Sequence, residues 1–301
     1  MGDWLVSIAG TPEGARLATM LALMSAVAHA GFGALQKGRH DPWLTRGFID
    51  LWLVVLTAPI ALFIVPWPEH TSFWLIMLGV VAVHFAYKLT MAMSYERAAY
   101  TVVYPVMRGT GPLVTVLAAA LIFNEHFNLV QWLGVACLSG GILLLAVVNL
   151  RSVRMSPGTM RAGLAWALAG GLLVAVYTTY DAWSIRQVPD PFTFLAWFFL
   201  LSSVDFTILG LWRYRHMAAP PTLGPLMTRG FFGAIIAWFS FGGVLLATRL
   251  DKVGEAAVLR ETSTVFAALI GWLFLGERVG WLRASLMALV ALGAVIVEMG
   301  R

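Results

Sequence analysis

Charged residues and cysteine are both scarce in this 301-residue sequence. Asp, Glu, Lys and Arg make up 12% of the chain, whereas hydrophobic residues make up 60%. Since a water-soluble domain usually has about 25% charged and about 45–50% apolar residues, this composition indicates an integral membrane protein. The single cysteine, Cys137, has no partner for an intrachain disulfide and lies in an apolar run, where we expect it to pack as a small core residue.

The sequence also lacks the motifs that mark several classes of enzyme. It has no Walker A phosphate loop, no HExxH or GxSxG motif, and no Cys/His cluster with metal-ligand spacing. We therefore expect a protein without enzymatic activity, cofactor or metal. The first residues, "MGDWLVSIAGTPEGAR", have neither the basic start nor the cleavage site of a signal peptide, so we expect none.

Long hydrophobic runs, in contrast, fill most of the chain. A bilayer core about 30 Å thick is crossed by roughly 20 apolar residues in a helix. The strand-like alternation of a membrane barrel is absent from the sequence. The sequence therefore predicts an all-α integral membrane protein with ten transmembrane helices, at 17–35, 47–65, 73–94, 99–121, 129–149, 162–184, 192–212, 229–248, 254–275 and 281–298.

The second half of the sequence repeats landmarks of the first half at a shift of 152 residues. The segment "RGTGPLVTVLAAALIFNE" (108–125) then aligns with "RETSTVFAALIGWLFLGE" (260–277), and Arg108 falls on Arg260. The glutamates that end the two segments also align, and we expect them to cap helix ends. An arginine thus recurs inside a predicted membrane helix of each half.

The shift divides the chain into two repeats, which we place at residues 1–150 and 151–301. Each repeat holds five predicted helices. Because five is an odd number, the second repeat must cross the membrane in the opposite sense to the first. Inverted repeats of this kind are common in secondary transporters, whose substrate lies near the bilayer midplane between the repeats.

The paired segments resemble the EamA-like ten-helix family of the drug/metabolite transporter superfamily. The resemblance is carried by "YPVMRGTGPLVTVLAAALIFNEHFNLVQWLGVACLSGGILLL" (104–145) and "AAVLRETSTVFAALIGWLFLGERVGWLRASLMALVALGAVIV" (256–297). In each segment a polar or proline-containing helix ends in Glu and a glycine-bearing helix follows. The resemblance implies a transporter in which the first, third and fourth helices of each repeat line a central cavity. It does not choose a substrate, because the family carries amino acids, sugars, nucleotides and drugs.

Most ionisable residues inside the predicted helices fall on the helices that the resemblance assigns to the cavity. A charged side chain at the centre of a membrane helix costs about 2.5–3.5 kcal/mol, and such residues usually face the bundle interior. Asp50 and Asp205, on the second and seventh helices, are exceptions. We expect the cavity to be lined by His29, His84, Lys88, Tyr104, Arg108, Tyr177, Tyr180, Asp181, Arg260 and Glu261.

Arg108, within "VMRGTGP", is the most deeply placed of these charges. It lies nine residues into its predicted helix, about 14 Å from the helix start at 1.5 Å per residue and near the middle of the bilayer core. A guanidinium group matches carboxylate or phosphate with two parallel hydrogen bonds. Arg108, Arg260 and Lys88 together favour an anionic group, whereas Asp181 and Glu261 suit an ammonium group or a proton. The mixture predicts an anionic or zwitterionic metabolite.

Two interpretations are open for several of these charges. Arg260 either contacts the substrate or forms a structural ion pair with Asp181 or Glu261. Lys88 either contacts the substrate or pairs with Asp181 or Asp205. Only the positions of the side chains can decide between these interpretations.

The histidines and tyrosines leave a similar choice. His29 and His84 are either core histidines or carriers of a coupling proton, a role that their ordinary pKa would suit, and Asp181 is a third candidate for proton coupling. Tyr177 and Tyr180 either pack in the core or form an aromatic box around the substrate.

The main alternative function is a cation or multidrug exporter that uses Asp181 and Glu261 within an aromatic cavity. The directions of Arg108 and Arg260 discriminate between the two functions. If both arginines face carboxylates of neighbouring helices, the anion hypothesis fails. A scaffold or receptor would not need so many charges inside the membrane.

Basic residues are distributed unevenly between the two ends of the predicted helices. Three of the twenty are buried, five lie at the end that carries both termini, and twelve lie at the opposite end. The positive-inside rule then places both termini outside the cell, whereas the resemblance implies that both are cytoplasmic. We expect a small-molecule substrate, a lipid bilayer, no nucleic-acid partner, a bacterial inner membrane, and a monomer or homodimer.

Overall fold

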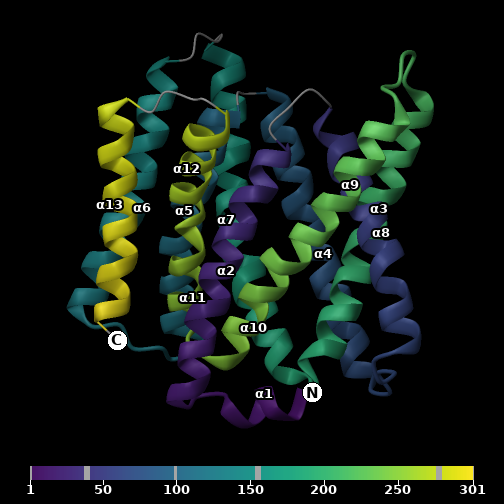
Figure 1. Ribbon diagram of the computed structural model, residues 1–301, viewed down its shortest axis with the longest axis horizontal. Helices are drawn as coiled ribbons and strands as arrows, with labels where there is room; N and C mark the ends of the chain where they lie inside the picture. The colour runs from purple at the N-terminus through teal and green to yellow at the C-terminus, as the bar shows by residue number, and fades with distance from the viewer. Residues whose placement is uncertain (1, 37–40, 98–99, 153–156, 276–279, 301) are drawn as a thin grey trace.

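A computed structural model of the chain shows a bundle of α-helices (Figure 1). The structure describes residues 2–36, 41–97, 100–152, 157–275 and 280–300. The helical elements are α1 (Gly2–Ile8), α2 (Pro12–Gln36), α3 (Pro42–Phe63), α4 (Thr71–Arg97), α5 (Tyr100–Ile122), α6 (Leu129–Ser152), α7 (Pro157–Gln187), α8 (Pro191–His216), α9 (Leu223–Ala237), the π-helical turn η1 (Trp238–Gly242), α10 (Gly243–Leu250), α11 (Val253–Glu261), α12 (Ser263–Leu275) and α13 (Trp281–Met299).

The predicted ten-span, all-α architecture is confirmed, with one interruption. Nine of the spans are single helices or continuous helical segments that are long and apolar enough to cross a membrane among the described residues. The tenth, expected at 254–275, is divided into α11 and α12 at Thr262. The short helix α1 precedes the first span and was not expected from hydropathy, because its few residues form no long apolar run.

The two repeats pack against each other through matching pairs of helices. Repeat one contains α2 to α6, and repeat two contains α7 to α13. Helix α3 packs on α8, α6 on α13, α5 on α7, and α2 on α11 and α12. The pair α6 and α13 forms one edge of the bundle and the pair α3 and α8 lies at the other, with both chain termini at the same end (Figure 1). Helices α2, α4, α5, α7 and α10 to α12 lie between these edge pairs and carry the predicted site residues (Figure 1).

Glycines allow the two edge pairs to approach closely. A Cβ atom on Gly47 of α3 would lie 2.6 Å from the Cα atom of Gly210 on α8, and one on Gly134 of α6 would lie 2.7 Å from the Gly293 carbonyl oxygen on α13. Small residues serve this purpose in membrane helices, since packing between helices is driven by close van der Waals contact rather than by water exclusion.

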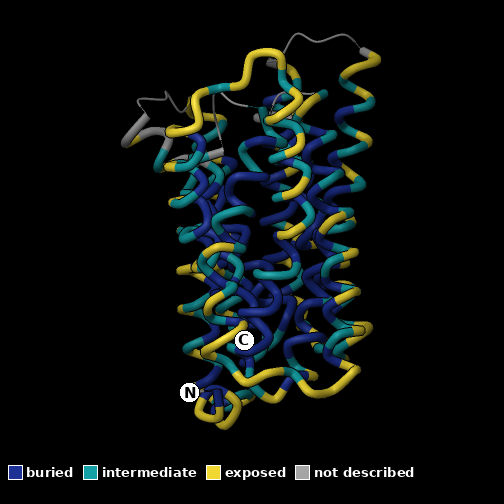
Figure 2. Tube along the Cα trace, turned by 90° about the vertical axis from the view of Figure 1, so that its right-hand side faces the viewer, coloured by how far each residue is buried: buried dark blue, intermediate teal, exposed yellow. Residues whose placement is uncertain are grey.

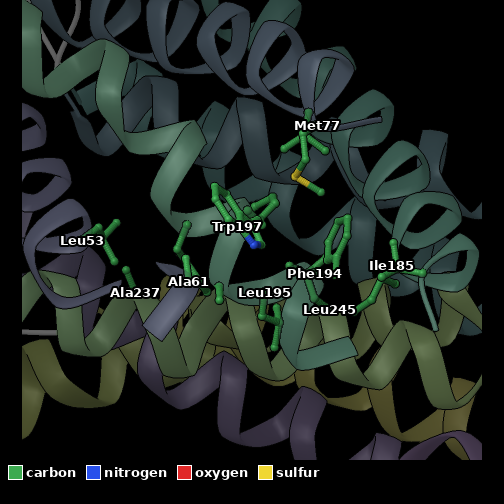
Figure 3. Packing of buried hydrophobic residues seen from close by; sticks show 14 of the residues in the cluster. Leu53, Ala61, Met77, Ile185, Phe194, Leu195, Trp197, Ala237 and Leu245 are labelled. Atoms are coloured by element: carbon green, nitrogen blue, oxygen red, sulfur yellow. The ribbon is translucent and has the colours of Figure 1, made fainter. Parts of the chain in front are cut away.

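The largest apolar core cluster lies between α3, α4, α8 and the α9–α10 segment. Phe194, Trp197 and Phe198 of α8 are buried there together with Met77 of α4 and Leu53 of α3, as the close-up in Figure 3 shows for several of these residues. Exposed residues concentrate at the two ends and on outward helix turns, while buried positions run through the interior (Figure 2). The interior is therefore where a charged side chain requires a partner.

Glu125 confirms one expectation, that the glutamate ending the first repeated segment caps a helix. Its carboxylate accepts hydrogen bonds from the backbone N–H groups of Val253 (2.6 Å) and Gly254 (3.0 Å) at the start of α11. It caps a helix of the other repeat, rather than the end of its own. Its sequence counterpart, Glu277, lies outside the described residues.

Candidate functional site

Arg108 of α5 and Glu261 of α11 form a buried ion pair between the two repeats. The Arg108 Nε atom lies 3.1 Å from Glu261 Oε2, and the side chains are only 1% and 3% exposed. Two prolines, Pro105 and Pro112, lie inside α5 on either side of the arginine. Because proline has no N–H group, Pro112 removes the donor that would ordinarily bond the Arg108 carbonyl. The pair thus lies at an irregular part of α5.

The matching segment of the second repeat is irregular for a different reason. Helix α11 ends at Glu261, and the Thr262 N–H donates to the Leu259 carbonyl at 3.1 Å, which closes a tight turn before α12 begins. Discontinuous membrane helices often form the substrate sites of secondary transporters, where freed backbone groups face the binding site. Hydropathy alone did not reveal this break, because the apolar residues of α12 continue the predicted span beyond the polar stretch at 260–264.

The Arg108 guanidinium group is left with unused donor groups. Its two amino nitrogens, Nη1 and Nη2, are buried and have no hydrogen-bond partner among the described residues. The Tyr104 ring lies beside the group, 5.8 Å from ring centroid to guanidinium carbon. A buried donor without a partner is costly, about 1–3 kcal/mol and more for a charged group. The two amino nitrogens are therefore able to donate to further acceptor atoms.

Arg260 of α11 lies among aromatic side chains. Its Nη2 atom donates a hydrogen bond to the Tyr177 hydroxyl at 2.8 Å, and its guanidinium carbon lies 5.5 Å from the centroid of the Phe241 ring. Among the described residues Arg260 forms no ion pair, so of its two interpretations the structural pair with Asp181 or Glu261 is not seen. Both Arg108 and Arg260 act electrostatically on Glu261, which places all three charges in one region.

Tyr177 connects the arginines to a second polar pair. Its ring lies 4.9 Å from the His84 ring and 4.9 Å from the Tyr87 ring, centroid to centroid. His84 Nε2 in turn lies 2.8 Å from Asp181 Oδ2, and both of these side chains are buried. This pair joins α4 of the first repeat to α7 of the second.

His29 lies at another contact between the two repeats, where α2 of the first repeat packs on the π-helical turn η1 of the second. Its Nδ1 atom lies 2.9 Å from the Ser240 hydroxyl oxygen, and its ring lies 6.1 Å from the Phe241 ring that Arg260 also contacts. π-Helical turns occur often at functional sites. Sequence reasoning found His29 but not Ser240 or Phe241, since neither carries a charge.

Lys88 is held in a separate cluster. Its Nζ atom lies 3.0 Å from Asp50 Oδ2, contacts Asp205, and donates to the Ser202 carbonyl at 2.6 Å. Arg46 pairs with the same Asp50 at 2.8 Å. Two cations therefore face two carboxylates, which favours the structural interpretation of Lys88. The spacing of Arg46 and Asp50, four residues apart on one helix face, was the signal that could have predicted this cluster.

Tyr180 also lies away from the arginines. Its hydroxyl group donates to the Ile76 carbonyl of α4 at 3.2 Å, and its ring packs near Trp183, with centroids 5.7 Å apart. Of the two tyrosines named for an aromatic box, Tyr177 therefore lies against Arg260 and Tyr180 does not.

The space beside His84, Tyr87 and Lys88 is narrow. A cavity of about 20 Å³ is lined by His84, Tyr87, Lys88 and Phe241, among other residues. This is room for about one water molecule. The cavity is too small to admit a metabolite, and neither Arg108 nor Arg260 is among the residues that line it.

Comparison with known proteins connects this geometry to a family. The sequence profile of the EamA-like transporter family matches residues 16–147 and 161–299, most of each half of the chain. The chain belongs to the EamA-like transporter family. Membership makes it a multi-pass membrane protein, as the resemblance in the sequence implied, and the family itself is one of transporters.

Two individual relatives of this EamA-like transporter add information on its fold and on its sequence. A solved structure titled "Crystal structure of protein" has a TM-score of 0.75 and 17% sequence identity, and the match covers 94% of this chain and 97% of that one. "Uncharacterized protein y4nH" of Sinorhizobium fredii (strain NBRC 101917 / NGR234) is 34% identical over 58 residues, which is 19% of this transporter. The chain spans about half the length of that curated relative. The first match establishes the fold alone.

Proposed function

We propose that this EamA-like transporter carries a small anionic or zwitterionic metabolite, such as a carboxylate or an amino-acid-like compound. Arg108 and Arg260 bind its anionic group. The observation that carries the proposal is the pair of buried Arg108 amino nitrogens without hydrogen-bond partners. A carboxylate could accept from both nitrogens at once, which is the geometry that guanidinium groups favour.

The balance of charge in this region supports the same proposal. Arg108 and Arg260 contribute two positive charges, and Glu261 is the carboxylate that both of them act on. Asp181 is already engaged by His84 at 2.8 Å. An additional negative charge would neutralise the excess, whereas an additional positive charge would enlarge it. Buried charges without compensation are strongly unfavourable.

The position of the site between the repeats supports transport by alternating access. Arg108 comes from the first repeat, whereas Tyr177, Arg260 and Glu261 come from the second. A rocking motion of one repeat against the other would change these contacts while leaving each repeat intact. Each repeat then contributes one arginine to a substrate bound between them.

We assign proton coupling first to the His84–Asp181 pair and then to His29. His84 and Asp181 connect α4 to α7 across the repeats, and Tyr177 links them to Arg260. The pair contains the two side-chain types that most often relay protons through membranes. His29, by contrast, has a neutral hydroxyl partner in Ser240. Coupling at the first pair would therefore change the charge next to the substrate.

The alternative, a cation or multidrug exporter, has weaker support. It requires Asp181 and Glu261 to be available to a cation, yet both carboxylates have buried basic partners. Arg108 does face a carboxylate of a neighbouring helix, but Arg260 faces aromatic rings. The anion hypothesis would fail if both arginines faced carboxylates of neighbouring helices. Arg108 does and Arg260 does not, so that condition is not met.

The cellular setting that we propose is a bacterial inner membrane, in agreement with the bacterial source of the curated relative. Both repeats lie on one chain, so a single chain carries every residue of the proposed site. We therefore propose that a monomer is sufficient for transport.

The first experiment is a ligand panel measured by thermal stability of the purified protein in detergent. The panel contains simple carboxylates, zwitterionic amino acids, phosphorylated metabolites and organic cations. A ligand at a hundred times its Kd stabilises the folded state by about 2.7 kcal/mol. We expect stabilisation by anionic or zwitterionic compounds, and its loss in Arg108→Gln. Stabilisation by organic cations alone would overturn the proposal.

A matched control separates binding from general damage. Arg213 is an arginine that pairs with Asp41 at 2.6 Å near the end of α8, far in sequence from the site. Arg213→Gln removes the same charge and should keep the ligand-induced shift. Arg108→Gln/Glu261→Gln removes both members of the buried pair, so it leaves no uncompensated carboxylate. If this double variant folds and still shows the full shift, Arg108 does not bind the ligand.

A further inference from the structure

The Arg108–Glu261 pair uses only one edge of the guanidinium group. Glu261 approaches the Nε side at 3.1 Å, while Nη1 and Nη2 have no hydrogen-bond partner among the described residues. A second anion could therefore reach Arg108 without first displacing Glu261. The carboxylate and a substrate can be present at the same time.

Counting charges in the loaded and empty carrier gives Glu261 a distinct role. The region holds two arginine charges and the Glu261 carboxylate. With a bound monoanion the sum is zero, and without substrate it is one positive charge. If Glu261 were neutral, the loaded carrier would hold one positive charge and the empty carrier two. Only the last of these net charges, two positive charges in the empty carrier with neutral Glu261, is higher than the one positive charge that the wild-type protein reaches when it is empty.

We propose that Glu261 is the internal counter-ion that allows the substrate-free carrier to change between its two orientations. This inference rests on the proposed function in taking the substrate to be anionic. Glu261 then decides whether the protein catalyses net transport or only exchange. A carrier without this carboxylate can reorient when loaded, but it cannot return empty, because two uncompensated charges must cross a closed, desolvated state.

The position of Glu261 supports this role over a purely structural one. It is the last residue of α11, next to the turn at Thr262, and it pairs with the other repeat. A carboxylate at a helix break can follow an arginine of the opposite repeat as the repeats rock, since the backbone around it is not locked by a regular helix. An ion pair that only stabilised the fold could equally well lie within one repeat, whose helices are not expected to move relative to one another.

Another buried glutamate on the same helix provides a matched control. Glu255 accepts hydrogen bonds from Gln131 Nε2 at 2.8 Å and from Lys252 Nζ at 2.9 Å. It lies near the start of α11, and neither of these two partners is one of the arginines. Glu255→Gln removes a buried charge from α11 without changing the count at the site.

The test measures the orientation of the substrate-free protein and therefore needs no identified substrate. In a Cys137→Ser background, cysteines replace Glu69 and Gln187, which line the same end pocket from different repeats. Spin labels at these two positions report the distance between the repeats by pulsed electron paramagnetic resonance in proteoliposomes. We expect two distance populations in the otherwise unaltered protein and in Glu255→Gln. In Glu261→Gln we expect the minor population to fall about tenfold or more.

Chemical rescue and charge rescue complete the experiment. Acetate, a free carboxylate, should restore the minor population in Glu261→Ala, whereas the neutral isostere acetamide should not. Arg108→Gln/Glu261→Gln returns the empty site to one positive charge, and we expect it to regain both populations. This double variant also decides the test if Glu261→Gln fails to fold.

The outcomes separate this inference from the proposed function. Two unchanged populations in Glu261→Gln, or a single population in the double variant, would overturn the counter-ion role. Either result would leave the ligand panel intact as a test of anion binding. Conversely, stabilisation by cations alone would defeat the proposed function, whatever the spin labels report.

Discussion

Lys88 and Asp50 form a buried ion pair that joins α4 to α3, with Lys88 Nζ 3.0 Å from Asp50 Oδ2. Asp205 of α8 contacts the same ammonium group, and Arg46 contacts the same Asp50. Three helices are thus tied together beside the proposed substrate site by a network whose charges balance. The Arg108–Glu261 pair differs in this respect. Two guanidinium nitrogens of Arg108 have no hydrogen-bond partner among the described residues, whereas the ammonium group of Lys88 has several partners.

The first prediction follows from this balance and concerns Lys88→Met. The variant leaves the Asp205 carboxylate without its cation, and breaking a buried pair in this way costs about 3–5 kcal/mol. We expect a large loss of thermal stability in detergent, while the Kd of any ligand found in the panel stays within about twofold. Lys88→Met/Asp205→Asn should recover much of the stability. Loss of ligand binding in the folded double variant would return Lys88 to the substrate site.

The second prediction compares two tyrosines that the sequence could not distinguish. Tyr177→Phe removes the acceptor that positions Arg260 at 2.8 Å, whereas Tyr180→Phe removes a hydroxyl that donates to the Ile76 carbonyl of α4. A hydrogen bond to a charged group contributes about 1.5–3 kcal/mol. We expect ligand affinity to fall about tenfold or more in Tyr177→Phe and to stay unchanged in Tyr180→Phe. Equal effects in titration calorimetry would show that Arg260 needs no positioning by Tyr177.

The sequence predicted the fold well because the bilayer imposes simple rules. Span number follows from hydrophobic length, and the inverted arrangement follows from an odd number of spans in each repeat. The break at Thr262 was not predictable in this way. It depends on local hydrogen bonding of the backbone, and the apolar residues of α12 continue the hydropathy signal past it.

The site was predicted less completely, and the reason lies in side-chain direction. Arg108, Glu261, His84 and Asp181 were all named from their depth in the membrane, and the structure brings each into a buried pair. Lys88 was named for the same reason, yet it faces Asp50 and Asp205 of two other helices. Depth identifies a charge that needs a partner, but only tertiary packing shows which partner it has.

The third prediction concerns proton coupling through His84 and Asp181. Asp181→Asn removes the carboxylate 2.8 Å from His84, so a proton on that histidine loses its compensating charge. We expect the variant to keep exchange of labelled for unlabelled substrate but to lose accumulation driven by a pH gradient. One pH unit corresponds to 1.36 kcal/mol, or about tenfold accumulation per proton. His29→Gln tests the second candidate for coupling, and it should keep both activities if the His84–Asp181 pair carries the proton. Gradient-driven accumulation that survives in Asp181→Asn would move the coupling site elsewhere.

The fourth prediction concerns the pH dependence of the Glu125 cap. Burial raises the pKa of the Glu125 carboxyl above its ordinary range, although the N–H groups of Val253 and Gly254 act in the opposite direction. The folded chain then holds the proton more tightly than the unfolded chain, whose glutamate pKa is about 4.3. The contribution of Glu125 to stability is thus complete below that pH and declines as pH rises through the folded pKa.

The measurement is the difference in melting temperature between the unaltered protein and Glu125→Gln over a range of pH. We expect this difference to become smaller as pH rises from about 4. Glu69→Gln, which removes an exposed acid at the same end of the bundle, corrects for the lost charge. A difference that grows with pH would mean that the backbone bonds, rather than burial, dominate at this cap.

The fifth prediction tests the close approach of α6 and α13. A Cβ atom on Gly293 would lie 2.6 Å from the Leu138 backbone nitrogen and 2.7 Å from the Gly134 carbonyl oxygen, so the two helices must separate to admit it. Overpacking of this kind costs about 1–3 kcal/mol. Gly140 of α6 has nothing within 4 Å of an added Cβ atom, and alanine is favoured over glycine in a helix by about 1 kcal/mol.

We therefore expect opposite effects from the same chemical change. Gly293→Ala should lower the melting temperature, and Gly140→Ala should leave it unchanged or raise it. Both residues belong to α6 and α13, which carry none of the proposed site residues, so ligand-induced shifts should persist in both folded variants. If Gly293→Ala were neutral, α6 and α13 would be free to separate. The back of each repeat would then belong to the moving parts of the carrier, and the rocking motion could not be confined to the helices that surround Arg108 and Glu261.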